Sequence, residues 1–283
     1  MNRNLRHYRL PEGNVQIAFS GGRTSGFMLH EILEANGGLP DRVEVTFQNT
    51  GREMPETLDF VQEVGGRWGV PIVWLEYRSY APFFEIVSHN SAARNGEPFE
   101  ALIRKKRGYL PNQQQRYCTE QLKVLTAKRY LRSLGWNRWT NFTGLRADEP
   151  SRLNKPQPPS CWTVRHPLAD AGVSKYDVER FWRAADFDLR LPLVNGKTIG
   201  GNCRDCFLKS EAEIAAYKRE HPEDRWSERM EALGSELTGS ASQAFFNKRW
   251  SHRELREFVE RQGDWIFDAE GWLCQAEGGE CFG

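Results

Sequence analysis

The sequence predicts an α/β fold in which helices flank a parallel β-sheet. Short apolar, β-prone runs in the first half of the chain alternate with segments whose apolar residues recur at helical spacing. This alternation is typical of parallel sheets with right-handed crossovers. A chain of 283 residues is long enough for one such domain with a smaller appendage.

Composition narrows the class of protein. Hydrophobic residues make up 39% of the chain, the net charge is +1, and the mean hydropathy is −0.68. No apolar run approaches the ~18 residues that a membrane helix needs, and residues 1–13 are polar with no apolar signal region. These features exclude a membrane protein, a secreted disulfide scaffold and a disordered chain. We expect a cytoplasmic protein without a membrane partner and without a global attraction to nucleic acid.

The first predicted unit is a strand, a glycine turn and a helix. The β-prone run Val15–Phe19 leads into Ser20–Gly26, and apolar residues at helical spacing follow until Gly37. Parallel sheets bind ligands at the carboxyl ends of their strands, and a helix N-terminus at that place attracts anions. The turn therefore suits a phosphate or pyrophosphate, although a lone turn of this kind would more often be a simple capped βα turn.

Further strands and helices follow along the chain. Residues 43–47 and 71–77 are predicted strands, and Pro55 opens a helix between them. Residues 82–87 are expected to form a short helix. Later predicted elements are a helix over 122–134, a fourth strand over 139–143, a helix around 178–182, helices within 207–263 and a short strand over 264–268.

Two arginines follow the fourth predicted strand. Arg146 and Arg152 lie at the carboxyl end of the sheet, where guanidinium groups suit recognition of phosphate or sulfate, and Glu149 can orient one of them. A surface salt-bridge loop is the alternative interpretation. The basic run 104–107 is expected to be a solvated loop, and its alternative is a clamp for a nucleic-acid backbone.

Cysteines are the candidates for metal or redox chemistry. The six in the chain are Cys118, Cys161, Cys203, Cys206, Cys274 and Cys281. Cys118 comes just before a predicted helix, whose dipole favours a thiolate. The pair Cys203-x-x-Cys206 permits a zinc site, half of an iron–sulfur site or a redox dithiol.

Three segments resemble one family in the same order. The turn at residues 20–25 resembles the pyrophosphate loop of the PP-loop, or adenine nucleotide α-hydrolase, superfamily. Residues 49–57 are similar to the Asp-Thr-Gly-x-x-x-Pro-Glu-Thr segment of its phosphoadenosine phosphosulfate (PAPS) reductase branch, and residues 144–152 resemble the Gly-x-Arg-x-x-Glu-Ser-x-Arg loop of that branch. Thr24 and Asn49 stand where the family has Asp. On these motifs the chain is identified as a member of the PAPS-reductase-like family.

The resemblance implies a five-stranded parallel sheet with flanking helices and a helical C-terminal cap. It divides the chain into an N-terminal tail over 1–13, a nucleotide-binding α/β domain over 14–199, and a helical region over 200–283 that carries the Cys-x-x-Cys pair. The implied ligand is an adenine nucleotide, ATP with Mg²⁺. The residues expected to bind it are Ser20, Gly21, Gly22, Arg23, Thr24, Ser25, Thr50, Gly51, Lys123, Gly144, Arg146 and Arg152.

The resemblance also implies an iron–sulfur cluster. Residues 116–123 are similar to a segment that holds a cluster ligand in the subgroup resembling DNA-phosphorothioation ATP pyrophosphatases. With the 85 residues that separate Cys118 from Cys203, this implies that Cys118, Cys203 and Cys206 bind a [4Fe–4S] cluster. The fourth ligand is left open. Cys281, Cys274 and Cys161 are the candidates, and a cluster with only three protein ligands is the alternative. Zinc is the alternative metal.

Two chemistries follow from the resemblance. In the favoured one, an ATP pyrophosphatase, an acceptor oxygen attacks the α-phosphate with help from Arg146, and sulfur then replaces the activated oxygen with help from the cluster. In the other, a sulfonucleotide reductase, Cys281 attacks the sulfur of a bound sulfonucleotide; Glu280-Cys281 resembles the catalytic motif of the reductases. A third hypothesis is an inactive nucleotide-binding partner subunit. Candidate acceptors are a tRNA base, DNA or a small metabolite, and a sulfur donor protein is a candidate partner.

Overall fold

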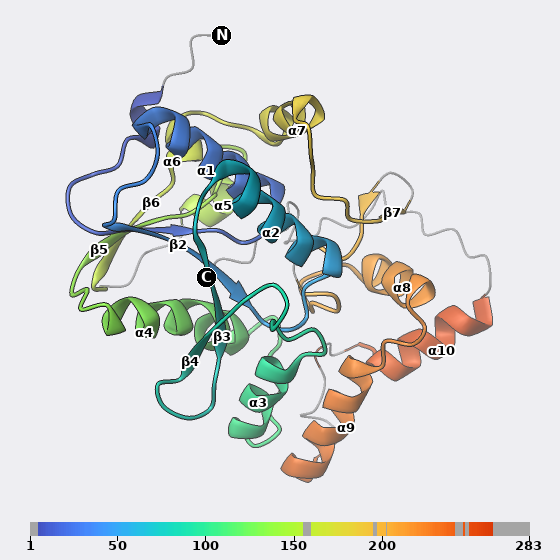
Figure 1. Cartoon of the computed structure of the whole chain (residues 1–283). Helices are drawn as coiled ribbons and strands as arrows, with labels where there is room; N and C mark the ends of the chain where they lie inside the picture. The colour runs from blue at the N-terminus through green and yellow to red at the C-terminus, as the bar shows by residue number, and fades with distance from the viewer. Residues whose placement is uncertain are drawn as a thin grey trace.

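A six-stranded sheet forms the centre of the molecule, for which we use a computed structural model (Figure 1). The structure describes residues 5–154, 160–194, 197–201, 203–240, 246 and 249–262. The strands, in the order in which they lie side by side, are β4 (Phe84–Val87), β3 (Ile72–Tyr77), β2 (Val43–Asn49), β1 (Val15–Ala18), β5 (Trp139–Phe142) and β6 (Trp162–Arg165). All neighbours run parallel except β3 and β4.

The predicted parallel sheet is confirmed, and two local predictions are corrected. Arg104 and Lys105, expected to lie in a loop, instead end the helix Glu97–Lys105. Strands β3, β2, β1, β5 and β6 are the five parallel strands of the family fold. Residues 84–87, expected to be helical, form β4 instead and pair antiparallel with β3. A strand is favoured here because β3 offers an open edge and because Phe84 packs on the ring of Tyr130, 5.9 Å away between centroids.

Helices cover both faces of the sheet (Figure 1). Those before the cap are η1 (Leu5–Tyr8), α1 (Arg23–Asn36), α2 (Pro55–Trp68), α3 (Glu97–Lys105), η2 (Thr119–Val124, a π-helical turn), α4 (Leu125–Ser133), α5 (Pro150–Leu153), α6 (Pro167–Asp170) and α7 (Lys175–Ala184). Alternate residues of β1 and β2, such as Ile17 and Phe47, bury against α1 and α2 in the largest apolar cluster. The opposite face lies under α4, where Leu131 and Trp139 form a smaller cluster.

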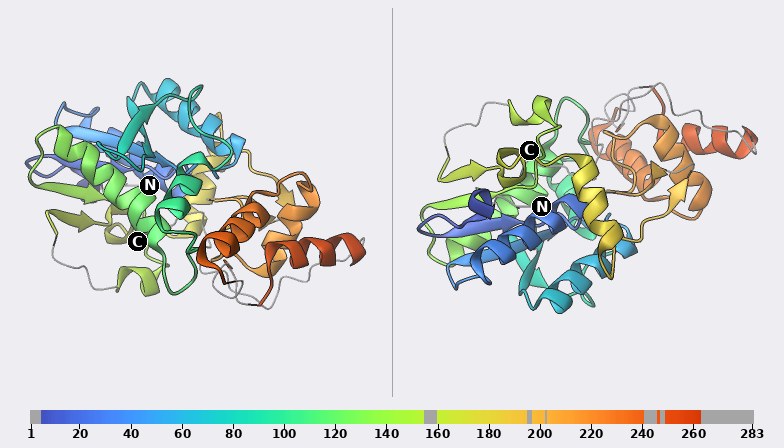
Figure 2. Two further views of the ribbon diagram at one scale, coloured as in Figure 1. Left: turned by 90° about the horizontal axis from the view of Figure 1, so that it is seen from below. Right: turned by 90° about the horizontal axis from the view of Figure 1, so that it is seen from above.

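Among the described residues, three helices form the predicted helical cap at the C-terminal side. They are α8 (Glu211–Glu220), α9 (Trp226–Thr238) and α10 (His252–Gln262), and they gather beside the sheet rather than on its faces (Figure 2). A hairpin of two short strands, β7 (Leu193–Val194) and β8 (Lys197–Thr198), precedes them. No helix in the described ranges is long and apolar enough to cross a membrane. The strand predicted over 264–268, together with Cys274 and Cys281, lies outside the described residues.

Candidate functional site

Three loops meet at the carboxyl edge of the sheet. They follow β1, β2 and β5, which are neighbours in the sheet, so residues 19–22, 50–54 and 143–149 converge although they are far apart in the chain. The edge lies next to the start of α1, whose N-cap residue, Gly22, has no side chain to cap the first amide groups of the helix. A helix start that no side chain caps is suited to an anion, because its first amide groups have no intrahelical acceptor.

The glycine loop after β1 has a tightly determined shape. Gly21 has a φ of +78°, and a Cβ there would lie 2.8 Å from Thr57 and 3.0 Å from Val61, so only glycine fits. The hydroxyls of Ser20 and Ser25 lie 2.8 Å apart, and Ser25 Oγ donates to the carbonyl of Gly22 at 3.0 Å. These bonds hold the loop around the start of α1.

Arg146 brings a positive charge to the glycine loop. Its side chain is 5% exposed, and its Nη1 donates to Thr24 Oγ1 at 3.3 Å. Its Nε donates to Asp148 at 2.8 Å, and its backbone N–H donates to Glu149 at 3.0 Å. Partial burial opposes the effect, but the backbone N–H of Lys175 and the Arg146 guanidinium hold the pKa of Asp148 below its usual value. Because Thr24 is neutral, the glycine loop places no negative charge beside the Arg146 guanidinium. An aspartate at this position, as in the family motif, would place one there.

The arginines predicted from sequence differ in their surroundings. Arg152 donates to Glu149 at 2.5 Å, so one carboxylate holds two arginines of the same loop. Arg23 turns to Asp188, to which it donates at 2.7 and 2.6 Å. We therefore place Arg146 and Arg152 at the sheet edge, and Arg23 in an ion pair with the segment after α7.

The surroundings of the loop after β2 explain why Asn49 stands where the family motif has an aspartate. Asn49 is fully buried, and its Nδ2 donates to Glu76 at 2.7 Å and to the carbonyl of Ala93 at 2.8 Å. An aspartate at this position would face the Glu76 carboxylate at hydrogen-bond distance. Asn49 thus replaces the family's acid because the neighbouring strand β3 already supplies one.

The same loop contacts the Cys-x-x-Cys segment. Thr50 donates its hydroxyl and its backbone N–H to the buried Glu53 carboxylate at 2.9 Å. The Thr50 hydroxyl also lies 3.4 Å from Cys203 Sγ, within hydrogen-bond distance for sulfur. Gly51 has a φ of +79°, and its Cα faces the backbone of Gly96. One of the predicted nucleotide-binding residues, Thr50, therefore adjoins a predicted cluster ligand.

The cysteines lie in two different surroundings. Cys118 precedes η2, as predicted, and Cys118 and Cys206 both pack against the apolar cluster that includes Phe99, Leu122 and Trp226. Cys161 instead packs against the cluster around Trp139. Lys123 lies within η2 and Gly144 is buried after β5.

No ready metal site is present in the part of the chain that the structure describes. Within it, no three His, Cys, Asp or Glu side chains are grouped closely enough to bind a metal ion. As described, Cys118, Cys203 and Cys206 therefore do not form a ligand set. The fourth candidate, Cys281, lies outside the described residues.

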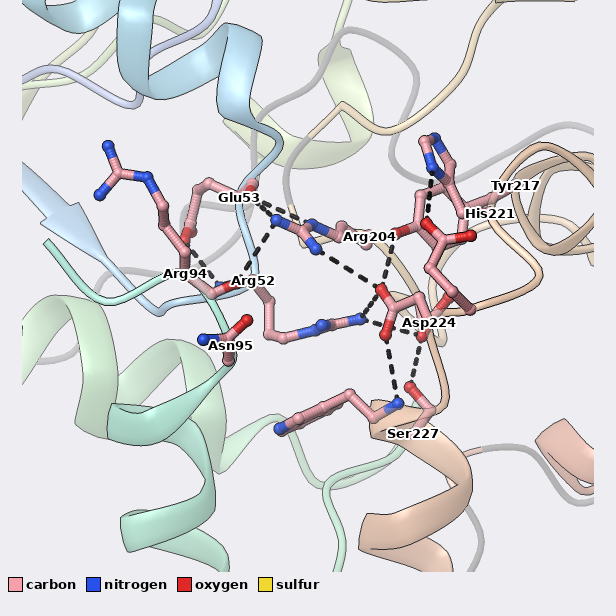
Figure 3. Close-up of polar contacts among 12 residues, drawn as sticks. Arg52, Glu53, Arg94, Asn95, Arg204, Tyr217, His221, Asp224 and Ser227 are labelled. Carbon is pink, nitrogen blue, oxygen red and sulfur yellow. Dashed lines mark hydrogen bonds and ion pairs between the residues drawn. The ribbon is translucent and has the colours of Figure 1, made fainter.

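Sequence reasoning missed a buried charge network between the sheet edge and the cap. Arg52, Arg204 and Asp224 meet in it, and Figure 3 shows both arginines reaching toward Asp224. The available signals were the charged residues between the two cysteines and the arginine inside the Asn-Thr-Gly-Arg-Glu segment. Their partners could not be chosen because many acids lie in the C-terminal third.

Comparisons with known proteins agree with this architecture. Residues 14–164, just over half of the chain, match the family model described as phosphoadenosine phosphosulfate reductase domain. The chain is 31% identical over 211 residues to an uncharacterized nin region protein, ORF290, of Escherichia phage lambda, a match that covers 70% of this chain and 67% of that protein.

Two solved structures are among those that match this chain. A PAPS reductase from Candida auris, in a phosphate complex, has a TM-score of 0.44 at 17% identity, covering 67% of this chain and 84% of that one. A U34-tRNA thiolase from Methanococcus maripaludis, with its [4Fe-4S] cluster, has a TM-score of 0.37 at 10% identity, covering 87% and 81%. The family match and the relative in phage lambda establish that this chain belongs to the phosphoadenosine phosphosulfate reductase domain family.

Proposed function

We propose that the sheet edge binds ATP with its pyrophosphate on residues 20–26 and that the protein is an ATP pyrophosphatase acting on an acceptor. One observation carries the proposal. The buried Arg146 guanidinium reaches the glycine loop at Thr24, beside a helix start that no side chain caps. An anion at this place would meet a positive charge and the amide groups of α1 together.

The proposed reaction is transfer of AMP to an oxygen of the acceptor. That oxygen forms a bond to the α-phosphorus, and the bond from the α-phosphorus to the bridging oxygen of the β-phosphate breaks. Pyrophosphate leaves with the electron pair. The charge that develops on pyrophosphate is stabilised by the start of α1 and by Arg146. The Mg²⁺ that accompanies ATP offsets charge on the phosphate oxygens when bound.

Sulfur transfer with an iron–sulfur cluster is a separate hypothesis. Its ligands would be Cys118, Cys203 and Cys206, with Cys281 as the fourth, and no reaction step is derived through it because these side chains do not form a ligand set in the described residues. Iron and acid-labile sulfide in anaerobically purified protein test it. Retained iron in the Cys118→Ser, Cys203→Ser and Cys206→Ser variants would count against it, whereas Cys161→Ser should keep the metal.

Sulfonucleotide reduction is the second candidate, supported by the family match over residues 14–164. In that reaction a thiolate, with Cys281 as its candidate, bonds to the sulfonyl sulfur, and the bond from that sulfur to the phosphate oxygen breaks. The nucleotide would again lie on residues 20–26, so binding alone does not separate the two reactions. Their products do, because one releases pyrophosphate and the other leads to sulfite when a thiol reductant is supplied.

A product assay decides between the two reactions. Purified protein is given ATP and Mg²⁺ with bulk tRNA, DNA or a metabolite extract, and in parallel PAPS with a dithiol. We expect acceptor-dependent release of pyrophosphate that is lost in Arg146→Ala. Sulfite from PAPS without pyrophosphate from ATP would establish the reductase instead. ATP binding with neither product would favour a nucleotide-binding partner subunit.

A further inference from the structure

A single buried arginine connects the loop after β2 with the Cys-x-x-Cys segment. Arg52 follows Gly51 and is 2% exposed. Its Nη2 donates to Asp224 at 2.7 Å and to Asp205 at 3.2 Å, and its guanidinium lies over the ring of Trp226, 4.7 Å from the centroid. Asp205 lies between Cys203 and Cys206, so the arginine contacts the segment that carries both thiols.

The Cys-x-x-Cys segment in turn donates hydrogen bonds to the loop after β2. The backbone N–H of Arg204 donates to the carbonyl of Arg52 at 2.9 Å. The Arg204 guanidinium donates to the carbonyl of Glu53 at 3.1 Å and lies 3.6 Å from Asp224 (Figure 3). Both residues between the cysteines therefore bind the loop after β2.

The acids in this network are themselves held in place. Asp224 accepts from the Tyr217 hydroxyl at 2.6 Å, and Asp205 accepts from Ser227 at 2.6 Å. Burial opposes the effect, yet the Arg52 guanidinium and the Tyr217 hydroxyl keep the pKa of Asp224 well below its usual range. Ionic groups held by several hydrogen bonds in a buried place have little room to rearrange independently.

The donors that a ligand would use in this loop already serve Glu53. Its carboxylate accepts from Thr50 N–H at 2.9 Å and from Arg52 N–H at 3.2 Å. A phosphate that took the Thr50 donors would change the position of Glu53. The Glu53 carbonyl accepts a hydrogen bond from Arg204, and Arg52 is the residue immediately before Glu53 in the chain. A change at Thr50 would therefore be passed to both residues between the cysteines.

We propose that Arg52 is a positioning residue that couples occupation of the nucleotide site to the conformation of the Cys203–Cys206 segment. The proposal rests on the proposed nucleotide-binding function of residues 20–26 and Thr50. The coupling element is the set of contacts from Arg52 to Asp205 and Asp224. By reciprocity, a change at the cysteine segment alters nucleotide affinity by the same factor.

Hydrogen–deuterium exchange of the full chain, with and without ATP and Mg²⁺, tests the coupling. In the wild-type protein, we expect ATP to slow exchange at residues 20–26 and 49–54, and also at residues 203–209 by about fivefold or more, the lower range of allosteric coupling. In Arg52→Met, ATP should still slow exchange at residues 20–26 but leave residues 203–209 unchanged. Arg52→Lys keeps the charge and can serve one carboxylate, so we expect a partial response.

Arg256→Met is the matched control. Arg256 also carries a guanidinium in a partly buried network, where it donates to Glu228 of α9 at 2.9 Å and to Glu260 of its own helix α10 at 2.8 Å. Neither contact involves the Cys-x-x-Cys segment. It should lower stability without removing the response of residues 203–209 to ATP. If Arg52→Met does not fold, Asp224→Asn takes its place, because it removes a charge from the same pair and keeps the shape.

The outcomes of this experiment distinguish a failure of the coupling from a failure of the proposed nucleotide binding. A wild-type response at 203–209 that persists at full size in Arg52→Met and Asp224→Asn would overturn the coupling. So would protection of residues 20–26 by ATP with no change at 203–209 in the wild type. Absence of any protection at residues 20–26 would instead overturn nucleotide binding, and the coupling with it.

Discussion

The loops at the sheet edge and the segment that carries Cys203 and Cys206 are held in place by different kinds of interaction. The glycine loop depends on one left-handed glycine and on hydroxyl bonds within six residues, such as Ser20 with Ser25. The cysteine segment depends on buried ions whose partners are 153 and 172 residues apart in sequence. The first region is therefore shaped by local sequence, and the second only by the completed fold.

The cap also holds several buried polar atoms for which the described residues supply no partner. Asp205 Oδ1, Lys218 Nζ, Glu231 Oε1 and His252 Nδ1 are buried and have no hydrogen-bond partner among the described residues. Such atoms cost free energy unless a partner or a water satisfies them. Burial raises the pKa of Glu231 to about 8 and lowers the pKa of His252 to about 4. We therefore expect the cap, more than the sheet edge, to respond to pH.

Gly21→Val should produce the largest loss of stability at the sheet edge. A φ of +78° and a Cβ position 2.8 Å from Thr57 predict a loss of about 2–5 kcal/mol, from the left-handed conformation and from overpacking. Gly13→Val is the control, since Gly13 has a φ of +80° but nothing within 4 Å of its Cβ position. Urea unfolding should show the smaller, purely conformational loss there. Equal losses in both variants would show that the close contacts at Gly21 do not matter.

Asn49→Asp tests the explanation for the missing family acid. Placing a second carboxylate against Glu76 in a fully buried position should cost about 3 kcal/mol, as for an unsatisfied buried charged group. The double variant Asn49→Asp with Glu76→Gln should recover most of this loss, because one donor and one acceptor face each other again. A single variant as stable as the wild type in urea would contradict the explanation.

Arg146→Ala should weaken nucleotide binding without comparable loss of stability. Removal of a charge-assisted contact predicts a loss of about 1.5–3 kcal/mol in ATP affinity, or roughly 10- to 100-fold. Arg23→Ala is the comparison, because the Arg23 side chain is directed to Asp188, whereas the Arg146 side chain reaches Thr24 of the glycine loop. Titration calorimetry should show a small change for it. An equal loss of affinity in both variants would place Arg23 in the site as well.

Glu231→Gln should change stability little near pH 5 and progressively more within a pH window above it. The pKa of Glu231 is raised from 4.5 to about 8 by burial, so the folded protein holds an extra proton between these values, and its stability falls as pH rises through them. Glutamine cannot ionise. The stability of the variant relative to wild type should therefore increase from pH 5 to about pH 8 and then level off. A difference that is independent of pH would contradict the raised pKa.

The same contrast explains what could be predicted from sequence. Strands β1, β2, β3 and β5, the glycine turn and the Arg146 loop follow from local pattern and family motifs. Strand β4 was missed because its backbone partner, β3, decides its conformation. The direction of Arg23 was missed because Asp188 lies 165 residues away. The Arg52 network was missed for the same reason, since charge patterns do not specify which distant acid an arginine meets.

Calorimetric titration of the wild-type protein with ATP and with AMP, in Mg²⁺, tests the central claim most directly. If residues 20–26 and Arg146 hold the pyrophosphate, ATP should bind at least about tenfold more tightly than AMP, which is 1.4 kcal/mol. The preference should largely disappear in Arg146→Ala. Equal affinity for ATP and AMP, or no heat of binding from ATP to the folded protein, would contradict the account.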